Sequence, residues 1–216
     1  MNASPESAQV GRRLLKVSDK QARIFEAAAT LFAERGFEGV TTQQISDRAE
    51  IAAGTLFRYA ATKGELLLMV YNEEMRTALD AGAEAAQGTP DPVAAVLAMI
   101  DPLLRAARHP ENTITYQREL LFGSPADKYR SEGLALVARL EAVIAERLAA
   151  AARSRGVAAE NLESQAQLAG RTVFAATHLM LAQPATGAHP GHDAAADLHA
   201  QIAQIVAGFF ATVERR

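Results

Sequence analysis

Residues 41–66 read TTQQISDRAEIAAGTLFRYAATKGEL, a stretch in which a tight turn separates two short helical patterns. Thr41 and Gln44 form a capping box, in which a hydroxyl and an amide side chain satisfy free N–H groups at the start of a helix. Thr62 and Glu65 repeat this pattern and open a long helix, which we expect to reach about residue 87. Between the two capping boxes, a second short helix is predicted over residues 52–60.

A longer helix is predicted ahead of this stretch, over residues 19–35. Its apolar side chains recur at helical spacing, at Ile24, Ala28, Leu31 and Phe32, and Gly36 follows as a stop signal. A supporting helix, a short positioning helix, a turn and a second short helix make up a helix-turn-helix. Because this motif places its last helix in the major groove, residues 19–66 are expected to bind DNA.

The side chains around the second short helix suit contacts with DNA. Small residues at its start allow backbone and bases to approach, and the Arg58 guanidinium can grip a phosphate or a guanine. Thr55 and Tyr59 offer hydroxyl groups to phosphates. Lys63 and Thr42 lie at helix starts, where free N–H groups favour an anion. The candidate DNA-binding residues are Thr42, Ala52, Ala53, Thr55, Arg58, Tyr59 and Lys63.

The composition favours helices along the whole chain. Of the 216 residues, 49% are hydrophobic and 47 are alanine, the strongest helix former. The absence of cysteine excludes disulfides, thiolate metal sites and thiol nucleophiles. The formal net charge is −3, yet residues 1–65 hold nine Lys and Arg against eight Asp and Glu. The acidic excess therefore lies in the rest of the chain.

Helical patterns continue to the C-terminus and are separated by Pro and Gly. Further helices are predicted over residues 92–108, 111–122, 125–155, 160–183 and 193–215. We find no strand pattern and no internal repeat, so we expect an all-α fold of about nine helices. The predicted domains are a flexible arm (1–18), a DNA-binding domain (19–66) and a helical effector-binding and dimerisation domain (67–216).

The predicted helix over residues 160–183 is apolar nearly all round, so it needs cover on more than one side. Its seams include Ala169, Val173, Ala176 and Met180, and then Leu168, Thr172, Ala175 and Leu179. A second copy of the chain can supply the cover, with burial inside one monomer as the alternative. The predicted dimer-interface residues are Ala169, Val173, Ala176, Met180, Ile202, Ile205 and Phe209.

One ordered pattern spans about 45 residues, from Arg23 to Leu66. It runs through Ala27-Ala28, Leu31-Phe32, Gly36-Phe37, Val40-Thr41-Thr42, Ile45, Ala49, Gly54-Thr55-Leu56-Phe57, Tyr59, Lys63 and Glu65-Leu66. This pattern resembles the DNA-binding domain of the tetracycline-repressor (TetR/AcrR) family. The resemblance implies that Thr42, Tyr59 and Lys63 hold phosphates. It also implies that Ala52, Ala53, Thr55 and Arg58 lie at or near base edges.

The resemblance further implies a homodimer, joined mainly by its last two helices, that binds an inverted-repeat operator in double-stranded DNA. Members of the family commonly repress transcription and release DNA when a small molecule binds the C-terminal domain. An effector would then shift the predicted helix over residues 63–87 and change the spacing of the two recognition helices.

Three residues depart from the family pattern. Glu50 stands where the turn usually has Gly, which costs about 1 kcal/mol if the backbone is left-handed there. Ala52 replaces a common Ser cap, worth about 1 kcal/mol, and Ala60 replaces a common aromatic. These departures favour the alternative function, a helical small-molecule-binding or oligomeric protein that has lost DNA binding.

An effector pocket is expected among the predicted helices over residues 92–183, for an apolar or amphipathic small molecule. Met and aromatic residues there are lining candidates, although plain core is the usual role of such residues. Tyr116, Gln117 and His178 would orient the ligand. The candidate pocket residues are Met99, Leu103, Tyr116, Gln117, Phe122, Phe174 and His178.

Enzyme and membrane signatures are not found in the sequence. There is no GxSxG, P-loop or GxGxxG motif, and no Glu-x-x-His pair of the di-iron type. His189 and His192 resemble half of a metal site but are read as a solvated loop pair. We therefore expect no enzymatic activity, no cofactor, no metal and no membrane span, and a cytoplasmic location.

Overall fold

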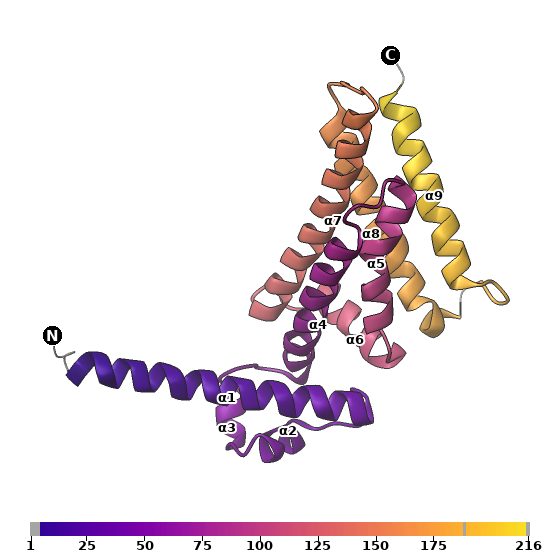
Figure 1. The fold of residues 1–216 in the computed structure, drawn as a ribbon. Helices are drawn as coiled ribbons and strands as arrows, with labels where there is room; N and C mark the ends of the chain where they lie inside the picture. Colours follow the sequence, from indigo (N-terminus) through magenta and orange to yellow (C-terminus); the bar gives the residue numbers. More distant parts are fainter. Residues whose placement is uncertain (1–4, 188, 215–216) are drawn as a thin grey trace. The chain divides into compact units, whose positions relative to one another are not determined.

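The computed structural model describes the backbone of residues 5–187 and 189–214, and within these ranges the side chains from residue 19 onward. Only helices and connecting segments occur there, so the all-α prediction is confirmed (Figure 1). The helices are α1 (Pro5–Arg35), α2 (Thr42–Arg48), α3 (Ala53–Leu56), α4 (Lys63–Ala85), α5 (Pro92–Ala106), α6 (Pro110–Phe122), α7 (Lys128–Ser154), α8 (Leu162–Thr186) and α9 (Ala194–Val213). The chain divides into two compact units, residues 1–71 and 72–216.

Helix α1 begins at Pro5, well ahead of the predicted start at residue 19. The structure thus has helix over residues 5–18, where the sequence analysis expected a flexible arm, while residues 1–4 lie outside the described residues. Proline is tolerated in a first helical turn, and no second proline follows to end the helix. The weak apolar periodicity of this segment hid the helix from sequence reasoning.

The first unit has the predicted helix-turn-helix layout. Ile24 of α1, Ile45 of α2 and Leu56 of α3 are fully buried, and the rings of Phe32 and Phe37 stack with centroids 5.8 Å apart. Helix α3 itself covers four residues, fewer than predicted, and hydrogen-bonded turns continue the chain to residue 60. The apolar residues chosen from the helical spacing therefore form the core that holds the motif together.

The first predicted capping box is complete, and the second is present in part. Thr41 Oγ1 accepts from the Gln44 N–H at 3.2 Å, and Gln44 Oε1 accepts from the Thr41 N–H at 2.9 Å. At α4, Thr62 Oγ1 accepts from the Glu65 N–H at 3.0 Å, but the Glu65 carboxylate takes the N–H of Ala61 instead of that of Thr62. These bonds fix where α2 and α4 start, and so fix the length of the segment that carries α3.

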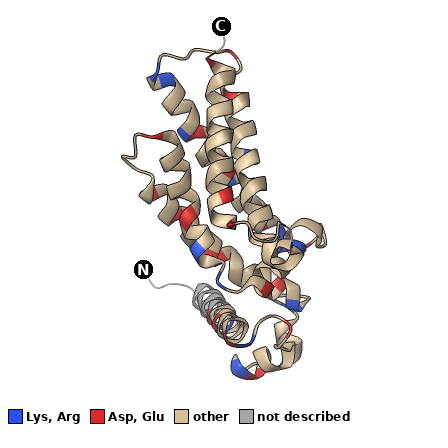
Figure 2. Ribbon diagram, turned by 90° about the vertical axis from the view of Figure 1, so that its right-hand side faces the viewer, with Lys and Arg blue, Asp and Glu red and all other residues tan. Residues whose placement is uncertain are grey.

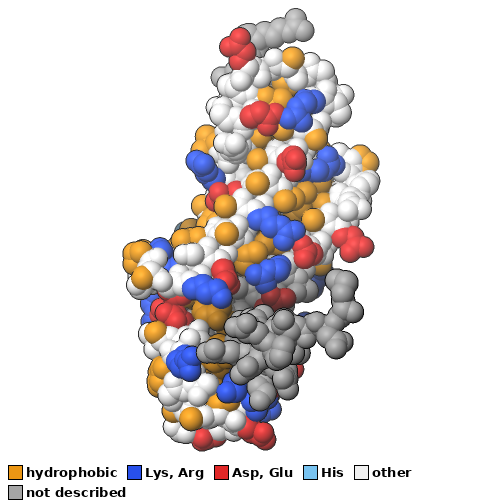
Figure 3. All heavy atoms as spheres, turned by 90° about the vertical axis from the view of Figure 1, so that its left-hand side faces the viewer, with side chains coloured by type: hydrophobic (Ala, Val, Ile, Leu, Met, Phe, Trp, Pro, Cys, Tyr) orange, Lys and Arg blue, Asp and Glu red, His pale blue; other side chains and the backbone are white. Residues whose placement is uncertain are grey.

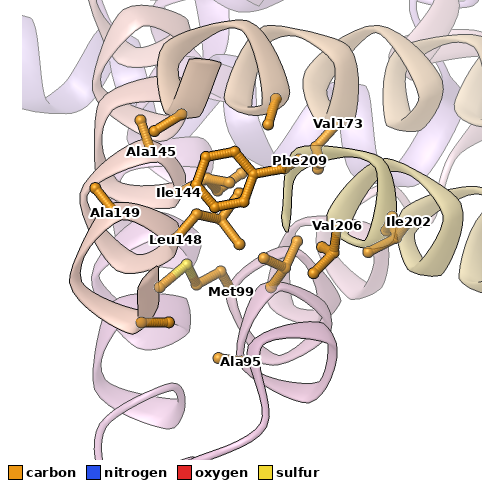
Figure 4. Packing of buried hydrophobic residues seen from close by; sticks show 14 of the residues in the cluster. Ala95, Met99, Ile144, Ala145, Leu148, Ala149, Val173, Ile202, Val206 and Phe209 are labelled. Carbon is orange, nitrogen blue, oxygen red and sulfur yellow. The ribbon is translucent and has the colours of Figure 1, made fainter. Parts of the chain in front are cut away.

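The core of the second unit lies among α5, α7, α8 and α9. Figure 4 shows Phe209 of α9 among Ile144 and Leu148 of α7 and Val173 of α8, all of which are buried. Gly170 brings α8 close to α7, because a Cβ atom there would lie 2.4 Å from the Glu141 carbonyl oxygen.

Most of the predicted dimer-interface residues are already covered within one chain. Ala169, Val173, Ile202 and Phe209 lie in the core of a single chain, and the half-buried Ala176, Met180 and Ile205 pack against that core. The alternative, burial within the monomer, holds for this seam because α7 and α9 cover that side of α8. The second seam is exposed instead, with Leu168 and Leu179 at 56% and 63%.

None of the helices described is both long and apolar enough to cross a bilayer.

Candidate nucleic-acid interface and effector region

A left-handed residue makes the turn between α2 and α3. Glu50 has φ 54°, and the next N–H, that of Ile51, donates to the Ser46 carbonyl at 3.0 Å. Glycine adopts this backbone freely, whereas a side chain there costs about 1–2 kcal/mol. The exposed contact between Glu50 Oε2 and Arg23 Nη1, at 3.9 Å, offsets little of that cost. The strain inferred from the sequence for a left-handed Glu50 is therefore present.

Helix α3 starts without a side-chain cap. Ala52 occupies the N-cap position with extended backbone angles, and no side-chain oxygen accepts a bond there. Only the Ala52 carbonyl takes part, accepting from the Thr55 N–H at 2.8 Å. The loss of a cap predicted from Ala52 is confirmed.

The candidate DNA-binding residues all lie in the first unit, and none of them is buried. Ala52 and Arg58 are exposed. The others are half-buried, and they are Thr42, Ala53, Thr55, Tyr59 and Lys63. The small residues at the start of α3 leave its backbone open, because a Cβ atom at Gly54 would meet nothing within 4 Å.

Lys63 has a structural role that the sequence did not reveal. Its Nζ donates to the carbonyls of Phe37 at 2.8 Å and Val40 at 3.0 Å, and it lies 4.0 Å from the centroid of the Phe37 ring. Two of the three ammonium donors are thus engaged inside the first unit. These bonds tie the segment between α1 and α2 to the first turn of α4. The third ammonium donor remains for a phosphate.

Phe57 was missed as a candidate. Its side chain is 50% exposed, while Leu56 beside it is fully buried. The signal was available, because a residue that follows an inward-facing leucine in a helix points to another side.

Charge alone does not mark the DNA-binding surface. Figure 2 shows Lys and Arg interspersed with Asp and Glu on helices of both units. On the face of the second unit in the upper part of Figure 3, blue and red side chains likewise alternate. The distribution of charge in these views therefore does not single out one surface.

In the second unit, Tyr116 is part of a buried hydrogen-bond chain. The Tyr116 hydroxyl donates to Asn72 Oδ1 at 2.9 Å, and Asn72 Nδ2 donates to the Tyr129 carbonyl at 2.7 Å. Gly133 leaves room for this chain, because its Cβ would lie 2.8 Å from Asn72 Oδ1. Burial raises the pKa of Tyr116, which stays a neutral phenol. Its hydroxyl therefore joins α6 to α4 within this unit.

Gln117 and His178 lie together between α6 and α8. Gln117 Nε2 donates to the His178 carbonyl at 2.9 Å, and the Phe174 and His178 rings have centroids 5.3 Å apart. Burial lowers the pKa of His178, so its imidazole is neutral at pH 7. One turn before Gln117, Thr113 is 6% exposed, and its Oγ1 has no hydrogen-bond partner. The structure thus groups neutral polar atoms at this helix pair.

The remaining candidate pocket residues are not gathered at one cavity. Phe122 is 81% exposed at the end of α6, where the helix ends before Gly123. Met99 is buried in the core, and Leu103 packs against that core.

A groove of about 520 Å³ lies instead between α5 and the start of α9. Its lining residues are Leu97, Ala98, Ile100, Asp101, Leu104, Ala195, Ala196, Leu198 and His199. None of the candidate pocket residues lines it.

The histidine-rich loop offers no metal-ligand set among the side chains described. His192 Nδ1 lies 3.1 Å from Asp197 Oδ2, and the rings of His189 and His192 have centroids 6.1 Å apart. In the part of the chain with described side chains, no three His, Asp or Glu residues are grouped so that they could hold an ion.

The helix-turn-helix coincides with a match to a known family. Residues 24–70 match the family model described as bacterial regulatory proteins, tetR family. Residues 24–70 are therefore a tetR-family segment. This match runs from the second part of α1 through α2 and α3 to the start of α4, and its range includes every candidate DNA-binding residue.

Two curated relatives match a short part of the chain. The HTH-type transcriptional repressor KstR of Mycobacterium tuberculosis is 34% identical over 56 residues, which is 26% of each chain. KstR of Mycolicibacterium smegmatis is 32% identical over 75 residues, which is 33% of this chain and 36% of the relative. The chain thus spans about a quarter to a third of the curated relatives it matches.

Solved tetR-family structures match over most of their length. Thermus thermophilus FadR, a transcriptional repressor in complex with lauroyl-CoA, is 28% identical with a TM-score of 0.66, over 87% of this chain and 93% of that one. Bacillus subtilis FadR, in complex with stearoyl-CoA, has a TM-score of 0.63 over 87% and 98% of the two chains. At 17% identity it supports the fold alone.

Proposed function

We propose that this chain is a sequence-specific DNA-binding transcriptional repressor that a small-molecule effector releases from its operator. The observation that carries the proposal is the α2–α3 unit, in which buried apolar residues position an open Gly54 and an exposed Arg58. Each subunit of a homodimer would insert residues 52–59 into a major groove, with the two grooves about 34–36 Å apart. We propose a cytoplasmic regulator, with the chromosome as its target, and not an enzyme.

A selection of random duplex DNA by the purified full-length chain tests the proposal. At moderate salt, we expect the retained DNA to contain an inverted repeat whose half-sites are one helical turn apart. Retention of duplexes with no shared sequence by a folded dimer would contradict sequence-specific binding.

Arg58→Ala then tests whether α3 carries the contact. Loss of a bidentate base contact should weaken operator binding by at least about fivefold per half-site. If Arg58 instead holds a phosphate, the dependence of log affinity on log salt should become shallower by about 0.9 per half-site. Arg118→Ala, which removes an exposed arginine of α6 in the second unit, is the matched control and should change neither quantity. Equal effects of the two variants would contradict the proposal.

For the effector, we propose a molecule with a long apolar part and a neutral polar group, and fatty acyl-CoA is the first candidate. The support is the 28% identical FadR of Thermus thermophilus, whose structure contains lauroyl-CoA, together with the neutral Gln117 and His178 between α6 and α8. A continuous α4 holds both Lys63 and Asn72, so it would couple effector binding to the DNA-binding unit.

Operator release measured by fluorescence anisotropy tests the effector class. Lauroyl-CoA should release the labelled operator at concentrations at which coenzyme A and laurate alone do not. The effector must bind the DNA-free state more tightly than the DNA-bound state, since equal affinity shifts nothing. Absence of release, together with absence of any thermal shift against a broad hydrophobic library, would contradict this part of the proposal.

For the homodimer, we propose that the exposed seam of α8 replaces the buried seam in the interface. Leu168 and Leu179 are large and exposed, and the exposed side of α9 is small, with Ala207, Gly208 and Ala211. Leu179→Arg should therefore yield a monomer in light scattering after size exclusion. Leu134→Arg, at the exposed leucine of α7, should leave the dimer intact. A monomeric wild-type chain would contradict the proposal.

The alternative function is a helical small-molecule-binding protein that has lost DNA binding. The strained Glu50 and the uncapped α3 support it, because both destabilise the recognition segment. A folded dimer that binds lauroyl-CoA but enriches no duplex, with or without this ligand, would favour the alternative.

A further inference from the structure

One apolar side chain stands out on the segment that would enter the major groove. Among the described side chains of residues 19–71, Phe57 is the only large hydrophobic one that is mostly open to solvent, at 50% exposure. The other phenylalanines that stabilise this unit, Phe32 and Phe37, are buried and stacked on each other. Packing of the helix-turn-helix therefore does not account for the aromatic ring at position 57.

The backbone places this ring beside the other outward-facing groups of α3. Phe57 has φ −64° and ψ −10°, which continues the helical path beyond Leu56. Residues three and four positions apart share a helix face, so Gly54 lies on the same side as Phe57 and Arg58. The missing side chain at Gly54 leaves open space there. The open backbone at Gly54 therefore lies on the same side as the Phe57 ring and the Arg58 guanidinium.

The major groove offers few partners for an aromatic ring. Base edges there carry hydrogen-bond donors and acceptors, and the C5-methyl group of thymine is the apolar exception. An exposed ring on a recognition segment gains free energy by covering such a methyl and gains nothing from a bare donor or acceptor. Arg58, its neighbour, can grip a guanine or a phosphate from the adjacent position.

We propose that Phe57 is a specificity-determining residue that reads the methyl group of one thymine in each operator half-site. The inference rests on the proposed DNA-binding function, and it adds a thymine contact to the guanine or phosphate contact expected of Arg58. Operators of this chain should hold a thymine at a fixed position, next to the base or phosphate that Arg58 contacts.

Replacement of each operator thymine by deoxyuridine, one symmetric pair at a time, tests the proposal. Deoxyuridine pairs as thymine does but lacks the C5-methyl, so only methyl contacts are lost. With the wild-type chain, one symmetric pair should weaken binding by about fourfold per half-site, the effect of uncovering one methyl-sized group. 5-Bromodeoxyuridine, whose bromine is close in size to a methyl, should restore the affinity at that pair.

Phe57→Ala should bind the natural operator more weakly and show no further loss on deoxyuridine substitution at the sensitive pair. Phe122→Ala is the matched control, because Phe122 is an even more exposed phenylalanine outside the helix-turn-helix, and it should retain both affinity and methyl sensitivity. Because the Phe57 side chain lies largely outside the core, circular dichroism melting should show that both variants are folded.

Three results would overturn the inference. They are half-sites without a fixed thymine, a wild-type chain insensitive to every deoxyuridine pair, and methyl sensitivity that persists in Phe57→Ala. In each of these cases the wild-type chain still binds its selected operator, so the proposed function stands. Failure of the wild-type chain to retain any duplex overturns both proposals together.

Discussion

Removal of the Lys63 ammonium should destabilise the helix-turn-helix before any DNA is present. Lys63→Met keeps the apolar stem and deletes the hydrogen bonds to the Phe37 and Val40 carbonyls and the contact with the Phe37 ring. Because Lys63 is half-buried, we count about 1 kcal/mol for each hydrogen bond and about 0.5 kcal/mol for the ring contact. Solvent at this half-buried position weakens all three interactions, so we expect the free energy of unfolding to fall by about 2 kcal/mol.

Amide hydrogen exchange of α2 measures this loss locally. Ile45 and Ala49 donate backbone bonds at the start and end of α2, and a loss of about 2 kcal/mol should speed their exchange by roughly 30-fold. Lys128→Met is the matched control. That lysine also faces a ring, at 5.1 Å from the Tyr129 centroid, but its Nζ is otherwise held only by Glu132 at 3.6 Å on the surface.

Unchanged α2 exchange in Lys63→Met, or equal acceleration in both variants, would refute the assignment of a structural role to Lys63. The same measurement also shows how a loss of operator affinity in Lys63→Met should be interpreted. If the variant loses both α2 protection and operator affinity, the affinity loss follows from a loosened scaffold and does not by itself place Lys63 on a phosphate.

Three further perturbations test other features. Glu50→Gly should raise the free energy of unfolding in urea by about 0.5–1 kcal/mol, because the relief of left-handed strain exceeds the added freedom of the unfolded chain. Glu50→Ala keeps the Cβ atom and should not stabilise the chain, so equal urea midpoints for the two variants would contradict the strain. Gly170→Ala should lower the free energy of unfolding by about 1–3 kcal/mol, because its Cβ atom would press on the Glu141 carbonyl. Gln167→Ala, on the exposed side of α8, should be nearly neutral, and a wild-type melting temperature for Gly170→Ala would show that α8 can move aside. Partial burial raises the pKa of Glu74, although the nearby His109 and Arg108 oppose this shift. The folded chain therefore holds the proton more tightly than the unfolded chain, and its stability should fall as pH rises from about 4.5 through the raised value. Glu74→Gln should flatten this pH dependence in urea unfolding, and an unchanged pH dependence would contradict the role of Glu74.

The local rules of the helix-turn-helix were readable from the sequence. The hydroxyl caps of Thr41 and Thr62, the buried Ile24, Ile45 and Leu56, and the helix break at Gly36 all depend on residues within one or two turns of each other. Short-range hydrogen bonds and helical periodicity decide such features, so no knowledge of the tertiary fold was needed.

Long-range partners were not readable in the same way. Lys63 bonds carbonyls 26 and 23 positions away, and carbonyls carry no sequence signal. The seams of α8 are similar in composition, so the sequence could not tell which one meets α7 and α9 and which one stays open. The exposure of Phe122 was not predictable either, because the spacing of an aromatic residue in a helix does not show whether it faces the core or solvent.

The buried Asn72 also bears on synthesis of the chain. Its partners, Tyr116 and the Tyr129 carbonyl, lie 44 and 57 positions later, whereas the ties of Lys63 to Phe37 and Val40 are complete once residue 63 is made. On the ribosome, the helix-turn-helix can therefore close its contacts while the Asn72 amide still faces water. The buried contacts of Asn72 must wait for α6 and α7 to emerge, so this part of α4 completes its packing later than the helix-turn-helix does.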